Sequence, residues 1–168
     1  AIHIEELPVR STRGRSNSSG PLYPSSSRSV AGEFGEVINL PLVPVHLSVL
    51  PDRRILFWGR DMVINQIGQV KQVGGHSEAF VWNMENGAML PVPNSTTNLF
   101  CSGHSFLPDG RLFVTGGHRS PHFDGAGEAH TNIFNYINNS WTLGPQMNHG
   151  PWYPYNVTLG TGETLIIA

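Results

Sequence analysis

Leu-Pro-Asp-Gly-Arg-Leu-Phe-Val at 107–114 decides the fold, because the chain carries a related stretch on either side of it. The upstream stretch is Leu-Pro-Asp-Arg-Arg-Ile-Leu-Phe at 50–57, and the downstream stretch is Leu-Gly-Thr-Gly-Glu-Thr-Leu-Ile at 159–166. In each, one apolar strand ends, a tight turn follows and a second apolar strand begins. Strand pairs that recur at intervals of about 50 residues predict a repeating antiparallel β structure.

Further strands follow each of the first two turns, so the sequence predicts repeats of four strands. The expected strands are 43–50, 55–58, 79–83, 88–92, 100–107, 111–115, 131–136, 140–143, 152–159 and 164–167. Trp82 and Phe134 lie 52 residues apart on third strands, and Met89 and Trp141 lie 52 residues apart on fourth strands. A four-stranded unit with a Gly-Gly pair after its second strand and an aromatic residue on its fourth is typical of a kelch-type propeller blade.

The predicted fold class is all-β, a kelch-type β-propeller that is incomplete in this chain. Propellers typically close with 4–8 blades, and residues 33–168 supply about two and a half, at 36–93, 98–145 and an incomplete 150–168. An open fan of blades leaves unpaired strand edges. We therefore expect the remaining blades to come from a longer chain. Residues 1–32 are rich in Ser and Arg and poor in large apolar side chains, which predicts a flexible tail or linker.

Composition excludes several classes of function. The 168 residues carry a formal net charge of −2 with 13% charged residues, which does not predict a nucleic-acid surface. Cys101 is the single cysteine, so no disulfide can form within the chain. No apolar run approaches the roughly 18 residues of a membrane span. The chain shows no signal-peptide pattern, and these facts do not define a compartment.

Cys101 precedes Tyr153 by 52 residues, which is also the offset between Leu107 and Leu159 in the repeated turns. Equivalent positions in neighbouring blades lie side by side, and the first strand of each blade lines the central channel. We therefore expect this thiol and this phenol to meet at one mouth of the channel. Tyr155 is the alternative partner, but its register equivalent is Gly103. Without the register match, Cys101 would be interpreted as a small buried core residue, and Tyr153 as core packing with a locally bonded hydroxyl.

Several strings of residues resemble the copper-radical oxidases, the family of glyoxal oxidase and galactose oxidase. They are Asn-Leu-Phe-Cys-Ser-Gly-His at 98–104, Leu-Pro-Asp-Gly-Arg at 107–111, Gly-Gly-His at 116–118 and Trp-Tyr-Pro at 152–154. Pro-Leu-Val-Pro-Val-His at 41–46 and the turn at 50–52 are similar to the first catalytic-domain blade of the glyoxal-oxidase-like group. The resemblance covers about residues 33–168.

The resemblance implies that Cys101 and Tyr153 become joined by a thioether bond. It also implies that Tyr153 is an equatorial copper ligand and the seat of a tyrosyl radical. The implied reaction is oxidation of a primary alcohol or aldehyde by O2, which gives H2O2, and the implied location is extracellular. The family's other copper ligands, two histidines and a second tyrosine, have no counterpart here. We therefore expect an isolated fragment to be inactive, because copper(II) needs several N and O donors.

A second function class stays open. A kelch-type propeller can keep its architecture and serve as a non-catalytic binding or structural module, in which case Cys101 would be an ordinary free thiol. The intact mass separates the two, because a thioether removes two hydrogens.

One stretch gathers three histidines and a glutamate: His118, His122, Glu128 and His130. A surface zinc or copper site is one interpretation, and a solvated loop is the favoured one, since Pro121 breaks any helix that would align His118 with His122. His104 and His149 flank the proposed site in sequence. We expect either to contact its surroundings but neither to bind the metal.

Two other features depend on their position in the predicted strands. Trp152 is expected to point between blades by strand alternation. Sequons for N-glycosylation begin at Asn94, Asn138 and Asn156. Asn156 falls in a predicted inner strand and is not expected to be modified, whereas the other two fall in turns and matter only in a eukaryotic secretory pathway.

Overall fold

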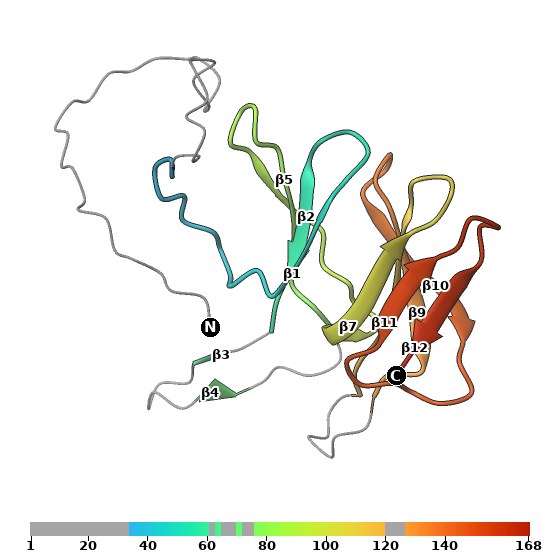
Figure 1. Ribbon diagram of the computed structural model, residues 1–168. Coiled ribbons are helices and arrows are strands. Elements are labelled where there is room, and N and C mark those ends of the chain that lie inside the picture. Colours follow the sequence, from blue (N-terminus) through green and yellow to red (C-terminus); the bar gives the residue numbers. More distant parts are fainter. Residues whose placement is uncertain (1–33, 61–62, 65–69, 72–75, 120–126) are drawn as a thin grey trace, which may run out of the picture.

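The computed structural model describes residues 34–60, 63–64, 70–71, 76–119 and 127–168 (Figure 1). The predicted tail at 1–32 lies outside the described residues. Within the described ranges every regular element is a strand, which confirms the all-β class. No helix in the described part of the chain is long and apolar enough to cross a membrane.

Two four-stranded antiparallel sheets form the body of the structure, in the orders β1-β2-β5-β6 and β10-β9-β8-β7. The strands of the first sheet are β1 (His46–Val49), β2 (Ile55–Trp58), β5 (Ala79–Trp82) and β6 (Met89–Pro91). Those of the second are β7 (Asn98–Phe106), β8 (Leu112–His118), β9 (His130–Asn135) and β10 (Ser140–Gln146). A pair, β11 (Tyr155–Thr158) and β12 (Thr164–Ile167), follows, with β11 beside β7 (Figure 1). In both four-stranded sheets the strands follow one another in sequence order, and the first strand of the repeat, β1 or β7, lies at one edge of the sheet.

The tight turns repeat in backbone conformation as well as in sequence. Arg53, Gly110 and Gly162 hold the same turn position, with φ of 69°, 84° and 91°. Each donates its N–H to the carbonyl of the leucine three residues earlier, at 2.9 Å. The turns between third and fourth strands match too, since Gly87 and Asn139 have φ of 75° and 54°. The 52-residue register of the last two repeats is therefore present in the structure.

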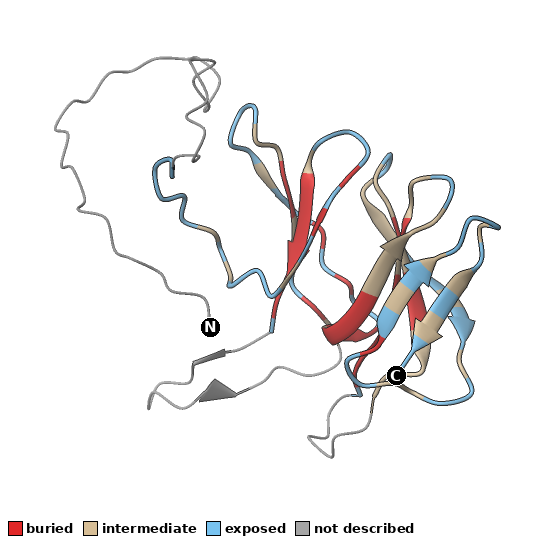
Figure 2. Ribbon diagram, in the orientation of Figure 1, coloured by how far each residue is buried: buried red, intermediate tan, exposed pale blue. Residues whose placement is uncertain are grey.

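The core lies between the first and second sheets (Figure 2). Its fully buried members include Leu56, Trp58, Leu99, Leu112, Val114 and Phe134. Two indoles fasten the sheets: Trp58 Nε1 donates to the carbonyl of Leu99 at 3.0 Å, and Trp141 Nε1 donates to the carbonyl of Val92 at 2.7 Å. The apolar face is thus covered where two sheets meet.

At the two ends of the fan, apolar side chains stay exposed. Leu47 and Val49 on β1, and Val157, Leu165 and Ile167 on β11 and β12, are all about half exposed. Further sheets would cover such faces in a closed ring, so the structure is that of an incomplete propeller.

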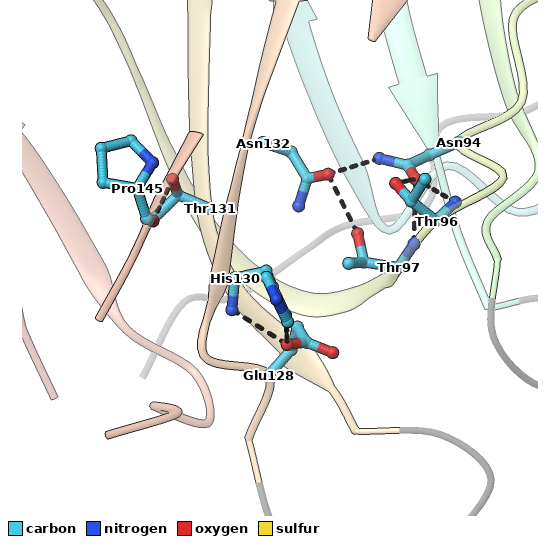
Figure 3. A network of polar contacts seen from close by, with 8 residues as sticks. All are labelled: Asn94, Thr96, Thr97, Glu128, His130, Thr131, Asn132 and Pro145. Atoms are coloured by element: carbon cyan, nitrogen blue, oxygen red, sulfur yellow. Dashed lines mark hydrogen bonds and ion pairs between the residues drawn. The ribbon is translucent and has the colours of Figure 1, made fainter. Parts of the chain in front are cut away.

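The connection from β6 back to β7 is held by buried asparagines (Figure 3). Asn94 Oδ1 accepts from the N–H groups of Thr96 and Thr97 at 2.9 and 3.0 Å. Its Nδ2 donates to Asn132 Oδ1 on β9 at 2.8 Å. The same Asn132 oxygen also accepts from Thr97 Oγ1 at 3.0 Å. This network fixes the chain just before it enters β7, and so fixes the start of the strand that holds Cys101.

Several strands differ in their bounds from the sequence prediction: β1, expected at 43–50, covers His46–Val49, and β10, expected at 140–143, extends to Gln146. The strand expected at 152–159 begins only at Tyr155, because Pro154 has no N–H to give to the ladder and Tyr153 has a left-handed φ of 57°. A short hairpin, β3 (Val63–Ile64) and β4 (Val70–Lys71), stands between β2 and β5 and was not predicted. Strands of two residues are too short to give a periodic signal.

Candidate functional site at Cys101 and Tyr153

Cys101 lies in an irregular stretch of β7. The pairing of β7 with β8 shifts register between Asn98 and Ser102, so Cys101 falls inside a bulge. Its φ is 65°, a conformation that costs a non-glycine residue about 1 kcal/mol or more. The side chain is 1% exposed. Non-glycine residues held in such a conformation are enriched at functional sites, which makes Cys101 a candidate beyond its sequence motif.

Both backbone polar groups of Cys101 bond outside its own sheet. The N–H donates to His46 Nε2 in the first sheet at 3.1 Å. The carbonyl accepts from the N–H of Tyr153, in the loop ahead of β11, at 3.1 Å. Cys101 is therefore held from the preceding sheet on one side and from the following one on the other.

Tyr153 is the second strained residue of the site, with a φ of 57°. It lies between Pro151 and Pro154, and its side chain is 61% exposed. The sequence predicts that the two residues hold equivalent positions on the first strands of successive repeats. The structure brings them together where the loop ahead of β11 meets β7. The difference is that Tyr153 occupies a loop rather than the strand itself.

Glycines let the Tyr153 loop approach β7 and β8. A Cβ on Gly103 would collide with the carbonyl oxygen of Pro154, and one on Gly116 would lie 2.6 Å from the carbonyl oxygen of Pro151. Gly116 also has a φ of 68°. Gly116, the first residue of the Gly-Gly pair that marks the repeat, therefore leaves space for the segment that carries Tyr153, whereas Gly117 leaves space for the backbone at Asn98.

The two side chains interact. Hydrogen bonding with the Cys101 side chain is the largest cause that raises the pKa of Tyr153 above its usual value, followed by the electrostatic effect of Cys101. Arg60 acts weakly in the opposite direction. The phenol is therefore protonated at neutral pH in the unmodified protein. The sulfur belongs to a buried residue, whereas Tyr153 is largely exposed.

The Trp152 ring contacts Tyr153 and begins a row of aromatic contacts. The Trp152 ring lies 5.4 Å from the Tyr153 ring and 5.6 Å, edge to face, from His118. Phe100 lies 5.8 Å from His118 and carries the Arg60 guanidinium 5.5 Å above its ring. Trp152 is 45% exposed beside Tyr153, and its contact with His118 joins the loop ahead of β11 to the second sheet. Because β11 begins after Trp152, strand alternation does not determine the direction of this side chain.

The other candidates lie elsewhere. Tyr155 opens β11 opposite Ile167 and is 76% exposed. His104 Nδ1 lies 3.2 Å from Ser48 Oγ, between the first and second sheets, and its ring contacts that of His46. His149 is exposed. Of these, His104 reaches the surroundings of Cys101 through His46.

The histidine-rich stretch is not a single loop. His118 is the buried last residue of β8, and His130 is the first residue of β9, with Nδ1 2.7 Å from Glu128 Oε1. His122 lies outside the described residues. In the ranges that the structure covers, no group of three or more His, Cys, Asp or Glu side chains is placed to hold a metal ion. Among the described residues of the site, the hydroxyl of Tyr153 offers a metal one oxygen donor, which is not a complete set of ligands.

Sequence reasoning missed two contributors to the site, His46 and Arg60. A signal for His46 existed, because it has the same register position as Gly103 and Tyr155, on the inner strand of its repeat. No comparable signal marks Arg60, which lies two residues after the end of β2.

Together the fan of antiparallel sheets and the paired thiol and phenol define a propeller-type protein with a candidate redox centre at one edge. No family model matches the chain. Two curated galactose oxidases from Gibberella zeae are each 25% identical to it over 139 residues, or 81% of this chain and 19% of theirs. A solved structure described as a novel fungal alcohol oxidase with catalytic diversity among the AA5 family, in complex with copper, matches with a TM-score of 0.63 and 24% identity. It is covered over 27% of its length, by 80% of this chain.

The galactose oxidase matches support a relationship between this chain and the copper-radical oxidases, and the structural match supports the fold. The chain spans about a fifth of the length of the curated relatives that it matches.

Proposed function

We propose that this chain supplies the cysteine and tyrosine half of the active centre of a copper-radical oxidase. The observation that carries the proposal is the contact between the buried Cys101 and the exposed Tyr153, both in left-handed conformations and joined by a backbone hydrogen bond. Two strained residues of this kind in contact are more typical of a functional site than of core packing. The galactose oxidase and AA5 oxidase matches support the copper-oxidase class.

The first chemical step that we propose is a thioether between Cys101 Sγ and the Tyr153 ring carbon next to the phenol carbon. The S–H and ring C–H bonds break and an S–C bond forms, so two protons and two electrons leave. Dioxygen accepts them and becomes H2O2. A sulfur substituent donates electron density to the phenol ring, which makes a tyrosyl radical at Tyr153 easier to form.

In the proposed reaction a primary alcohol loses two hydrogens and becomes an aldehyde, or an aldehyde hydrate becomes an acid, while O2 becomes H2O2. Copper, when bound, supplies a redox partner that shares the two-electron change with the modified tyrosine. The residues of this chain have simpler tasks. Tyr153 offers its hydroxyl oxygen as a ligand after losing its proton, Cys101 tunes the ring, and Trp152 shields one side of it.

The remaining ligands and blades would come from segments beyond this chain, as the fifth of the relatives' length that it spans suggests. From the repeated turns and strands, we assign blades to 36–93 and 98–145 and the start of another blade to 150–168. The described residues alone would then give no oxidase activity.

Intact mass and peroxide release test the proposal in the full-length protein. Exposure to copper and air should lower the mass by two hydrogens and yield H2O2 with primary alcohols or aldehydes. C101S and Y153F should abolish both changes, while Y155F, two residues away, should keep them. An unchanged mass, with Cys101 still open to alkylation in denaturant, would instead favour the binding or structural module.

We also propose an extracellular location, and the sequons give it a test. Asn138 lies exposed in the turn between β9 and β10, whereas Asn94 is 0% exposed and its amide already donates to Asn132. Protein secreted by a eukaryotic host should therefore carry a glycan at Asn138, which N138Q removes and N94Q does not. The natural protein without that glycan, recovered from inside its own cells, would contradict the proposed location.

A further inference from the structure

We propose that His46 is a positioning residue that holds Cys101 in its left-handed conformation and so aims the sulfur at Tyr153. The inference deepens the proposed function, because it concerns how the cysteine and tyrosine are brought into reach of one another. It starts from one contact, the 3.1 Å hydrogen bond from the Cys101 N–H to His46 Nε2.

The bulge in β7 explains why this bond matters. β7 pairs with β8 at Asn98 and then regularly from Ser102 to Phe106, and Cys101 lies in the shifted part between them. Its N–H points out of its own sheet, and His46 is the acceptor that the first sheet provides. A buried N–H without an acceptor is strongly disfavoured, so the imidazole and the bulge depend on each other.

The His46 ring is held on both sides. It stacks on Trp58 with ring centres 5.2 Å apart and planes 17° from parallel, and it meets the edge of His104 at 5.9 Å. His104 is itself held by Ser48 Oγ at 3.2 Å. Trp58 also donates to the carbonyl of Leu99, two residues before Cys101. One indole thus orients the imidazole and the backbone that it binds.

Only a nitrogen with a free lone pair can accept this bond, so His46 must be neutral with its proton on Nδ1. Burial, and then the nearby His104, lower the pKa of His46 to about 4. His104, which faces it from β7, has its own pKa lowered by burial. Both rings are therefore neutral over the physiological range, and the acceptor is available there.

The bond reaches the reactive pair through the backbone. Cys101 is gripped at its N–H by His46 and at its carbonyl by the N–H of Tyr153. If the first grip is lost, the residue can relax toward an extended backbone, which is intrinsically favoured for a residue with a Cβ. That rotation swings the Cα–Cβ bond, and displacements of about 1 Å at a reacting group can lower a rate by about a hundredfold.

Packing alone is the competing explanation for His46, and two variants separate it from positioning. H46F keeps a ring that can stack on Trp58 and removes the acceptor. H46Q loses the stack but offers an amide oxygen in a similar place. H149F, at an exposed histidine, is the matched control.

The experiment uses full-length protein prepared without copper and then given copper and air, with the two-hydrogen mass loss followed over time. We expect H46F to form the thioether about tenfold more slowly or worse, H46Q to recover most of the rate, and H149F to match the wild type. A wild-type rate in H46F would overturn the inference. Equal impairment of H46F and H46Q would do the same, because it would point to packing.

A second readout needs no copper chemistry. Ultraviolet titration of the copper-free protein, with Y153F subtracted, follows the Tyr153 phenol, whose pKa is raised by its contact with Cys101. H46F should lower this pKa toward the usual value and H46Q should restore it, whereas an unshifted pKa in H46F would count against His46. If the wild type never loses two hydrogens, the proposed function fails while this titration still decides the role of His46.

Discussion

The second sheet meets its two neighbours in different ways. Large side chains fill its interface with the first sheet. Trp58 and His46 come from the first sheet and His104 from the second, and Trp141 of the second sheet reaches across to the carbonyl of Val92. Arg54 adds a bond from its guanidinium to the carbonyl of Tyr136 at 2.6 Å. This interface is built from rings and long side chains, and its strength comes from buried area and directed hydrogen bonds.

Toward β11 the same sheet presents glycines and small polar groups. Gly103 and Gly116 leave room for the backbone at Pro154 and Pro151. Thr115 Oγ1 donates to Asn156 Oδ1 at 2.6 Å, beside that approach. Here the two backbones come close because side chains are missing, not because they interlock.

Cys101 stands on the boundary between these two interfaces, bonded by its N–H to one and by its carbonyl to the other. The difference indicates a division of tasks. The side-chain interface sets the conformation of the cysteine, and the glycine interface lets the tyrosine come near. Each can be disturbed separately, and the predictions below are ordered by the size of the expected effect.

Gly103→Ala should have the largest effect. Its Cβ would collide with a backbone oxygen at Pro154, which cannot move without displacing Tyr153. We expect a loss of about 3 kcal/mol in the free energy of unfolding and no thioether formation. Denaturant titration and intact mass measure the two.

Gly160→Ala is the matched control, since nothing lies within 4 Å of a Cβ at that position. Its unfolding midpoint should stay near that of the wild type. If G103A kept both wild-type stability and wild-type cross-linking, the close approach at the glycine interface would have no functional weight.

Acid should weaken the side-chain interface next. The folded-state pKa of His46 is about 4 against 6.5 in the unfolded chain, so below pH 6.5 the unfolded state binds the proton first. Stability should therefore be complete above pH 6.5 and fall between pH 6.5 and 4, by about 2–3 kcal/mol from this group. Burial of His104 acts in the same direction.

Urea titrations at several pH values would measure that slope in the wild type and in H46Q. The variant should lose stability less steeply over this window, because its side chain cannot take up a proton. Parallel curves for the two proteins would contradict the assignment of the slope to His46.

Much of this arrangement could be predicted from the sequence. The turns at Gly110 and Gly162 follow from their residues, and these turns give the 52-residue offset between the second and third repeats. Because neighbouring sheets share one register, the offset also brings Cys101 and Tyr153 to the same edge. These predictions needed only periodicity, which single sequences express well.

The rest departs from regular strand geometry, which periodicity assumes. The bulge at Cys101 and the loop at Tyr153 have left-handed backbones, so strand alternation does not apply to the residues beside them. The contact between His46 and Cys101 joins residues 55 apart in the chain through a side chain and a backbone group. Neither a histidine nor a cysteine in the sequence predicts a bond of this kind, because it depends on how the two sheets pack.

A smaller effect is expected from Thr115→Val, which keeps the shape of a fully buried side chain and removes its hydroxyl. Asn156 Oδ1 would lose the bond from β8. We expect a cost of about 1–2 kcal/mol, because a polar atom is left without its partner. Thr142→Val, at an exposed position on β10, should change little in the same denaturant titration. Equal losses in the two variants would show that the bond between β8 and β11 contributes no stability of its own.

The smallest effect concerns the contact itself. In copper-free protein, Cys101→Ala should lower the pKa of Tyr153 toward its usual value, because hydrogen bonding with the Cys101 side chain is the largest cause that raises it. Cys101→Ser, which keeps a hydroxyl at that position, should shift it less. Ultraviolet titration against Y153F isolates the one phenol from the other tyrosines. The two interfaces together predict this shift, since one holds the sulfur and the other admits the ring. An unchanged Tyr153 pKa in C101A would mean that the ring and the sulfur are not in contact before copper binds. Copper binding would then be needed to bring them together.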